Sequence, residues 1–183
     1  MKDFIRKDQI FSLCGLNCSL CLMYFGHYCP GCGGGEGNQP CAIARCSRNH
    51  GNIEYCFLCK EYPCSQYEDI ELYDSFITHR NQKKDMERAA RIGLEAYHRE
   101  QREKAEILNH LLTHYNDGRH KSFFSLAVNL LEVSALSEII IALDEDTKNS
   151  GLSAKEKAKA AETSLKAHAK SSDVVLKQNK KKI

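Results

Sequence analysis

The chain has 183 residues, a net charge of +2 and a mean hydropathy of −0.49, which fits one ordinary domain or a small metal domain joined to a helical one. It holds no run of 18 apolar residues, so the sequence predicts no membrane-spanning helix. Residues 1–8 are charged throughout and lack the apolar core of a signal peptide. We therefore expect a cytoplasmic protein with no membrane partner.

Composition divides the chain near residue 70. All ten cysteines lie between Cys14 and Cys64, together with all three prolines and eight of the eleven glycines. The residues after Cys64 contain neither cysteine nor proline. We therefore expect a cysteine-rich metal-binding domain over residues 10–70, an α-helical extension over residues 80–175 and a basic, frayed tail over residues 176–183.

The cysteines are candidate metal ligands because of their spacing, which is C-x3-C-x2-C-x7-C-x2-C-x8-C-x4-C-x9-C-x2-C-x4-C. Three pairs are of the C-x2-C type, in which two intervening residues let the chain turn tightly and aim both sulfurs at one ion. A disulfide framework is the alternative, but it needs an oxidising compartment, and no targeting signal is visible. The predicted ligands are Cys14, Cys18, Cys21, Cys29, Cys32, Cys41, Cys46, Cys56, Cys59 and Cys64.

The metal is expected to be zinc. A segment of this size seldom stabilises itself by apolar burial alone, and a structural zinc ion supplies on the order of 10 kcal/mol. Cys14, Cys18 and Cys21 have the spacing of a radical-SAM cluster loop, but the chain is too short for the barrel of those enzymes. The ferredoxin spacings are also absent. We therefore expect about two Zn²⁺ ions, with an iron-sulfur cluster as the alternative cofactor.

Ten thiols do not divide into four-ligand sites without remainder. One expected site is local and combines Cys29, Cys32, Cys41 and Cys46. The other expected site ties the ends of the segment together and combines Cys18, Cys21, Cys56 and Cys59. Cys14 and Cys64 can replace members of either site, and His27 or His50 can assist a third. The sequence leaves this partition open.

Four stretches together resemble the cysteine-rich prokaryotic family catalogued as domain of unknown function 3795. The stretches are Cys14-Gly15-Leu16-Asn17-Cys18-Ser19-Leu20-Cys21, Cys29-Pro30-Gly31-Cys32, Cys41-Ala42-Ile43-Ala44-Arg45-Cys46 and Cys56-Phe57-Leu58-Cys59-Lys60-Glu61-Tyr62-Pro63-Cys64. The resemblance covers about residues 10–70, and all ten cysteines correspond to positions of that family. It implies a metal-binding module and assigns no reaction.

The remainder of the chain has helical apolar spacing. Residues 81–115 are expected to form one helix, or two if the polar stretch 98–106 is a break, and 116–118 should end it. Further helices are expected over 122–131, over 136–143 with Ser134 as N-cap, and after a capping box that joins Ser153 to Glu156. The expected fold class is thus a small, irregular, metal-stabilised cysteine-rich module with little regular strand, followed by about four helices.

The function expected from these patterns is that of a zinc-binding, non-catalytic module that contacts a protein partner. No nucleophile–base set, paired-acid motif or nucleotide fingerprint stands out, and His110 and His114 lack the glutamate of a zinc protease motif. The tail is rich in lysine, but over the whole chain acidic residues are almost as numerous as basic ones, 24 against 26, so we expect no nucleic-acid partner. An iron-sulfur redox or electron-transfer protein is the alternative. Seven aromatic residues of the metal segment are expected either to contact a partner or to pack on the helices: Tyr24, Phe25, Tyr28, Tyr55, Phe57, Tyr62 and Tyr67.

Overall fold

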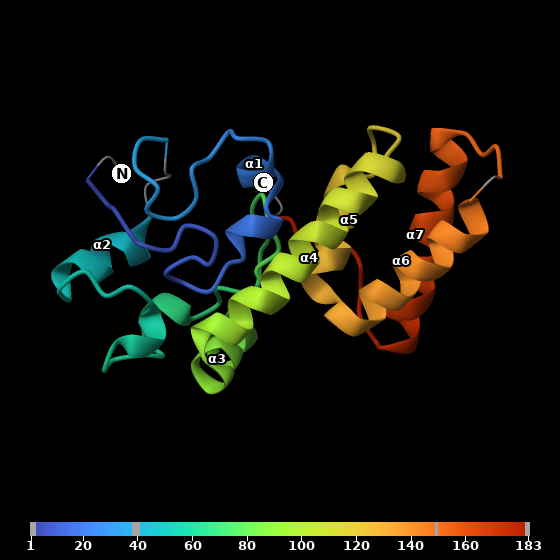
Figure 1. The fold of residues 1–183 in the computed structure, drawn as a ribbon. Coiled ribbons are helices and arrows are strands. Elements are labelled where there is room, and N and C mark those ends of the chain that lie inside the picture. Colours follow the sequence, from blue (N-terminus) through green and yellow to red (C-terminus); the bar gives the residue numbers. More distant parts are fainter. Residues whose placement is uncertain (1–2, 38–40, 149, 182–183) are drawn as a thin grey trace. The chain divides into compact units, whose positions relative to one another are not determined.

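The computed structural model describes residues 3–37, 41–148 and 150–181, and these form seven α-helices without a β-strand (Figure 1). Two isolated antiparallel bridges, between Ile5 and Gly34 and between Phe11 and Asn17, are the extended pairings within the described residues. The expectation of a helical chain with little regular strand is confirmed. The helices are α1 (Leu22–Phe25), α2 (Ala42–Asn49), α3 (Gln82–Ile92), α4 (Leu94–His114), α5 (Lys121–Leu130), α6 (Val133–Thr147) and α7 (Ala154–Ser171).

The chain divides into two compact units. The first ends at Gln101 and takes in the chain again from Asn179, and the second is Arg102–Gln178. The boundary thus falls inside α4, and the unit that holds the cysteines reaches well beyond residue 70. No helix of the described residues has both the length and the apolar character needed to cross a membrane.

The core of the first unit explains its extent. Phe11 and Tyr55 of the cysteine-rich segment form one buried cluster with Met86, Ala89 and Tyr97, which α3 and α4 supply. The ring centroids of Phe11 and Tyr97 lie 4.7 Å apart. A short, glycine-rich segment has few large apolar side chains of its own, so the helices that follow complete its core.

The seven aromatic residues that the sequence marks as possible contacts are mostly covered. Tyr55 and Tyr67 are buried, and Tyr28 alone of the seven is largely exposed. Phe57 and Tyr62 pack against the buried cluster around Phe11. Packing with side chains of α3 and α4 is therefore observed for Tyr55, Phe57 and Tyr62.

Residues 81–115 form two helices, and the break lies at Gly93 rather than in the polar stretch 98–106. Gly93 has φ +85°, which glycine adopts without the steric cost that a side chain brings. Its N–H still closes the last turn of α3 on the carbonyl of Ala89, at 3.1 Å. The polar stretch is helical throughout, and Arg88 of α3 donates two hydrogen bonds to Glu100 within it.

The second unit is a packed group of regular helices. The capping box at the start of α7 is confirmed, since the side chain of Ser153 accepts from the N–H of Glu156 and Glu156 accepts from the N–H of Ser153. The expected cap at Ser134 is wrong. Helix α6 begins at Val133 with Glu132 as N-cap, because the chain becomes extended for only two residues after α5.

Small side chains let α7 pack closely on its neighbours. Ala158, Ala161, Leu165 and Ala169 are buried and recur every three or four residues, which places them on one face of the helix. This face meets α5 and α6, and Figure 1 shows α6 and α7 running side by side. The helix is exposed on its other faces, as its lysine-rich composition predicts.

The basic tail pairs with the loop before α3 at Asn179. The N–H of Asn179 donates to the Asp74 carboxylate at 2.8 Å, and the N–H of Asp74 donates to the carbonyl of Asn179 at 2.8 Å. The segment expected to fray is therefore paired with the first unit at this residue.

Candidate metal centre

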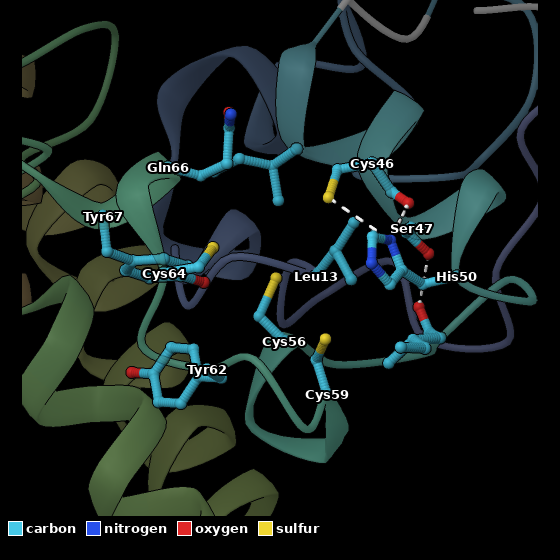
Figure 2. A pocket seen from close by; sticks show the side chains of 12 residues that line it. Leu13, Cys46, Ser47, His50, Cys56, Cys59, Tyr62, Cys64, Gln66 and Tyr67 are labelled. Carbon is cyan, nitrogen blue, oxygen red and sulfur yellow. Dashed lines mark hydrogen bonds between the residues drawn. The ribbon is translucent and has the colours of Figure 1, made fainter.

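Four cysteines from three separate stretches line one pocket of the first unit. Cys46 lies on α2, Cys56 and Cys59 flank a single 3-10 turn, and Cys64 follows shortly after. The N–H of Cys59 donates to the carbonyl of Cys56 at 2.9 Å, so this C-x2-C pair makes the tight turn that the spacing predicts. Figure 2 shows the four sulfurs facing a common space.

The size of the pocket limits what can occupy it. Its volume is about 30 Å³, which accommodates an ion or a water molecule. An organic substrate needs about 300 Å³ or more. Leu13, Ile43, Tyr62 and Tyr67 also line the pocket and keep much of its wall apolar. The pocket therefore suits a small, thiophilic ligand.

The thiols of this pocket influence each other electrostatically. The pKa of Cys56 is raised to about 11, first by burial and also by the neighbouring Cys64, Cys46 and Cys59, against a hydrogen bond from Tyr67. Thiolates this close together would repel one another, and a bound cation would relieve that repulsion.

His50 stands at the edge of the same pocket. Its Nδ1 lies 3.6 Å from the sulfur of Cys46 and 2.9 Å from the carbonyl oxygen of that residue. Its Nε2 lies 3.3 Å from a carboxylate oxygen of Glu61. The Cys46 carbonyl and then Glu61 raise the pKa of His50. A histidine oriented by a carboxylate in this way resembles a metal ligand. His50 is one of the two histidines that the sequence suggests as additional ligands. The other, His27, is exposed.

A second group of thiols adjoins the pocket. Cys14 interacts electrostatically with Cys32, with Cys41 and with Cys56 of the pocket, and Cys18 interacts with Cys32, Cys14 and Cys21. Burial raises the pKa of Cys14 to about 12. Cys14, Cys32 and Cys41 also pack against the buried cluster of Phe4, Leu13, Ile43 and Ala44.

The structure groups the neighbouring thiols differently from the expected division. Cys41 is the N-cap of α2 and Cys46 lies five residues further on, within the helix. Cys46 interacts electrostatically with Cys64 and Cys59. Cys56 and Cys59 join Cys46 and Cys64 rather than Cys18 and Cys21.

In the described residues, no three side chains of cysteine, histidine, aspartate or glutamate are arranged so that they could hold a metal ion. All ten cysteines are free thiols.

The histidine pair of α4 has partners of its own. The Nε2 of His110 lies 2.9 Å from a carboxylate oxygen of Asp144, and the ring centroid of His110 lies 4.6 Å from that of His114. The Tyr115 hydroxyl donates to the same carboxylate at 2.7 Å. Against the effect of burial, these hydrogen bonds lower the pKa of Asp144. The contacts give the pair a structural explanation.

Comparison of the chain with protein-family models, with curated proteins and with solved structures gives no match. The resemblance to the cysteine-rich family therefore stays a prediction, and the function is argued from the residues alone.

Proposed function

We propose that this chain is a zinc-binding, non-catalytic module in which the metal stabilises the first unit for contact with a protein partner. The observation that carries the proposal is the convergence of Cys46, Cys56, Cys59 and Cys64 on one small pocket beside His50. Four thiolates are the ligand set of closed structural zinc sites, and they leave no open position for a substrate. The family resemblance, with its metal-binding implication, agrees with this proposal.

The negative charge of the pocket thiolates favours a divalent cation. Four thiolates carry a charge of −4, and a divalent cation reduces the sum to −2, which relieves the repulsion among the pocket sulfurs. Zinc suits a tetrahedral all-sulfur set and does not change its oxidation state. An iron-sulfur cluster accepts the same four thiolates, so it is the competing occupant that the experiment must separate.

The partner surface that we propose is the loop before α3. Leu72, Tyr73 and Phe76 have exposed fractions of 52%, 48% and 66%. The loop is held by Asp74, which accepts hydrogen bonds from Thr78 and from the N–H of His79. Exposed aromatic and aliphatic side chains on a fixed backbone are typical of protein contacts.

Elemental analysis tests the metal. The full chain is purified without oxygen, and zinc, iron and acid-labile sulfide are measured alongside the visible absorption spectrum. We expect zinc and no visible chromophore. Cys59→Ser should lose about one zinc ion, whereas Cys29→Ser, a matched change outside the pocket, should keep the full content. Iron with sulfide, or unchanged zinc in Cys59→Ser, would contradict the proposal.

A further inference from the structure

The loop before α3 and the basic tail carry opposite charges. Residues 68–76 of the loop include Glu68, Asp69, Glu71 and Asp74 and no basic residue. Residues 176–183 of the tail carry four lysines and no acidic residue. Exposed charges attract each other over about 10 Å at 0.1 M salt, so a lysine-bearing segment is drawn to this loop.

One residue of the tail is bound to the loop through its backbone. The N–H of Asn179 donates to the Asp74 carboxylate, and the N–H of Asp74 donates to the carbonyl of Asn179, both at 2.8 Å. Both residues belong to the first unit, and Asn179 is exposed. Because Asn179 contributes only backbone atoms to these two bonds, another residue with a free N–H can take its place.

Hydrogen bonds within the loop hold Asp74 in position for this contact. Its second carboxylate oxygen accepts from the hydroxyl of Thr78 at 3.0 Å and from the N–H of His79 at 2.9 Å. The ring nitrogens of His79 lie 2.9 Å from the hydroxyl of Ser75 and 3.1 Å from the carbonyl oxygen of Ile70. The donor and acceptor that meet the tail are thus fixed by the loop itself, which lowers the entropy cost of binding a segment there.

The tail leaves much of the loop uncovered. Leu72 and Tyr73, which precede Asp74, have exposed fractions of 52% and 48%. Lys180 and Lys181 are exposed and form no ion pair with a residue that the structure describes. Two hydrogen bonds contribute little net affinity, so a segment that also contacts the apolar side chains would bind more strongly than the tail.

We propose that the loop before α3 binds a lysine-bearing peptide segment of the protein partner, and that the basic tail occupies this place until the partner displaces it. The inference rests on the proposed contact with a partner at this loop and does not depend on the metal. The partner segment offers a backbone N–H and carbonyl to Asp74, lysines to the acidic residues and an apolar side chain to Leu72 and Tyr73. The tail is a built-in competitor, because an intramolecular segment acts at an effective concentration on the order of millimolar.

Two variants of the full chain test the competition. Asn179→Pro removes the N–H that the carboxylate accepts, whereas the matched control Asn179→Ala keeps it. A synthetic peptide of residues 176–183 is titrated into the isotope-labelled chain, and the amide signal of Asp74 is followed by NMR. We expect Asn179→Pro to bind the peptide about tenfold more tightly than the parent chain, and Asn179→Ala to match the parent. Equal affinity in all three chains would refute competition, and no binding to Asn179→Pro would refute the loop as a receptor.

Changes in the peptide test the chemistry of the segment. Glutamine in place of the three consecutive lysines should weaken binding to Asn179→Pro about tenfold, because the long-range attraction is lost. Proline in place of the peptide's asparagine should abolish the response of the Asp74 amide, and alanine there should preserve it. Unchanged affinity of the glutamine peptide would refute the requirement for lysine, and a full response to the proline peptide would refute the backbone contact.

The unmutated chain covers the case in which Asn179→Pro alters the fold. A nitroxide label on the peptide, added in excess, should broaden the amide signals of Leu72, Tyr73 and Asp74, and broadening confined to other residues would refute the site. Zinc is measured in the same samples. A zinc-loaded chain that binds no peptide would overturn the inference and leave the metal site intact. Peptide binding by a chain that takes up no zinc would overturn the metal site and leave the inference intact.

Discussion

Different interactions stabilise the interior of each of the two compact units. In the second unit, fully buried aliphatic residues such as Leu108, Leu111, Leu136 and Leu165 lie on regular helices, so apolar burial and helical hydrogen bonds act together. The first unit has short helices before α3, its buried clusters include the aromatic rings of Phe4, Phe11, Tyr55 and Tyr97, and partly buried cysteines pack against them. The irregular backbone of the first unit therefore depends on specific hydrogen bonds and ring contacts more than the helices of the second unit do.

Buried polar groups show the same contrast. In the first unit they bond across long distances along the sequence, as when the Tyr97 hydroxyl donates to Asn17 at 2.9 Å. In the second unit, the buried Asn129 side chain donates to the carbonyl of Ser125, one turn earlier on the same helix. Loss of one partner should therefore damage the first unit more than the second.

Metal removal should give the largest effect. Chelation of the full chain should abolish hydrogen-exchange protection through α3 and up to about Gln101, because structural zinc contributes on the order of 10 kcal/mol to small modules. Protection in α5, α6 and α7 should persist. The control is the same chelator saturated with calcium. Loss of protection in both units alike would show that they fold as one.

Replacement of one glycine by alanine in each unit should give the next largest loss of stability. Gly15 has φ +99°, and a Cβ there would lie 2.5 Å from the carbonyl oxygen of Gln82 and press on Met86. Gly118 has φ +90°, and a Cβ there meets nothing within 4 Å. Gly118→Ala should cost about 1 kcal/mol of strain, and Gly15→Ala about 3 kcal/mol or more, since a clash with backbone is added. Denaturant unfolding followed by hydrogen exchange measures both, and equal costs would contradict the packing of the Cys14–Cys18 loop on α3.

Removal of one tyrosine hydroxyl in each unit should cost more unfolding free energy in the first unit than in the second. Tyr97→Phe leaves the buried side-chain oxygen of Asn17 without its donor, which should cost about 1–3 kcal/mol. Tyr115→Phe leaves the Asp144 carboxylate, whose side chain is 45% exposed and can be hydrated, so it should cost less than about 1 kcal/mol. Unit-resolved unfolding free energies compare the two. A larger loss in Tyr115→Phe would reverse the contrast.

The smallest effect concerns the pH dependence of the second unit. Hydrogen bonds from Lys159 and then Lys166 lower the pKa of Glu162 to about 2, against an ordinary value of 4.5. A lowered carboxyl pKa contributes stability that is present above pH 4.5 and is lost as the pH falls towards 2. Because both lysines are exposed to solvent, we expect a contribution of about 1 kcal/mol.

Glu162→Gln should remove that acid-dependent loss in the second unit, as measured by unfolding free energy between pH 5 and pH 2.5. The exposed Glu138 provides the matched control, and Glu138→Gln should leave the slope unchanged. An equal slope in the parent chain and in Glu162→Gln would contradict the assignment.

Local patterns in the sequence were sufficient for much of the fold. Apolar spacing identified the helical region, and the Ser153–Glu156 pair marked the start of α7, because a capping box is made by residues three positions apart. The cysteine spacing predicted the tight Cys56–Cys59 turn for the same reason. The sequence leaves open one helix or two with a break in the polar stretch, and it is the glycine at 93 whose backbone permits the break.

Tertiary structure alone decided which thiols are neighbours and where the first unit ends. Cys46 lies within α2, and long-range packing brings it to Cys56, Cys59 and Cys64. Likewise, α3 belongs with the cysteine-rich segment because Met86 fills the space beside Gly15. Sequence spacing predicts contacts only between residues that lie within a few positions of each other along the chain. Contacts between distant residues follow from the shape of the whole core, which many side chains determine together.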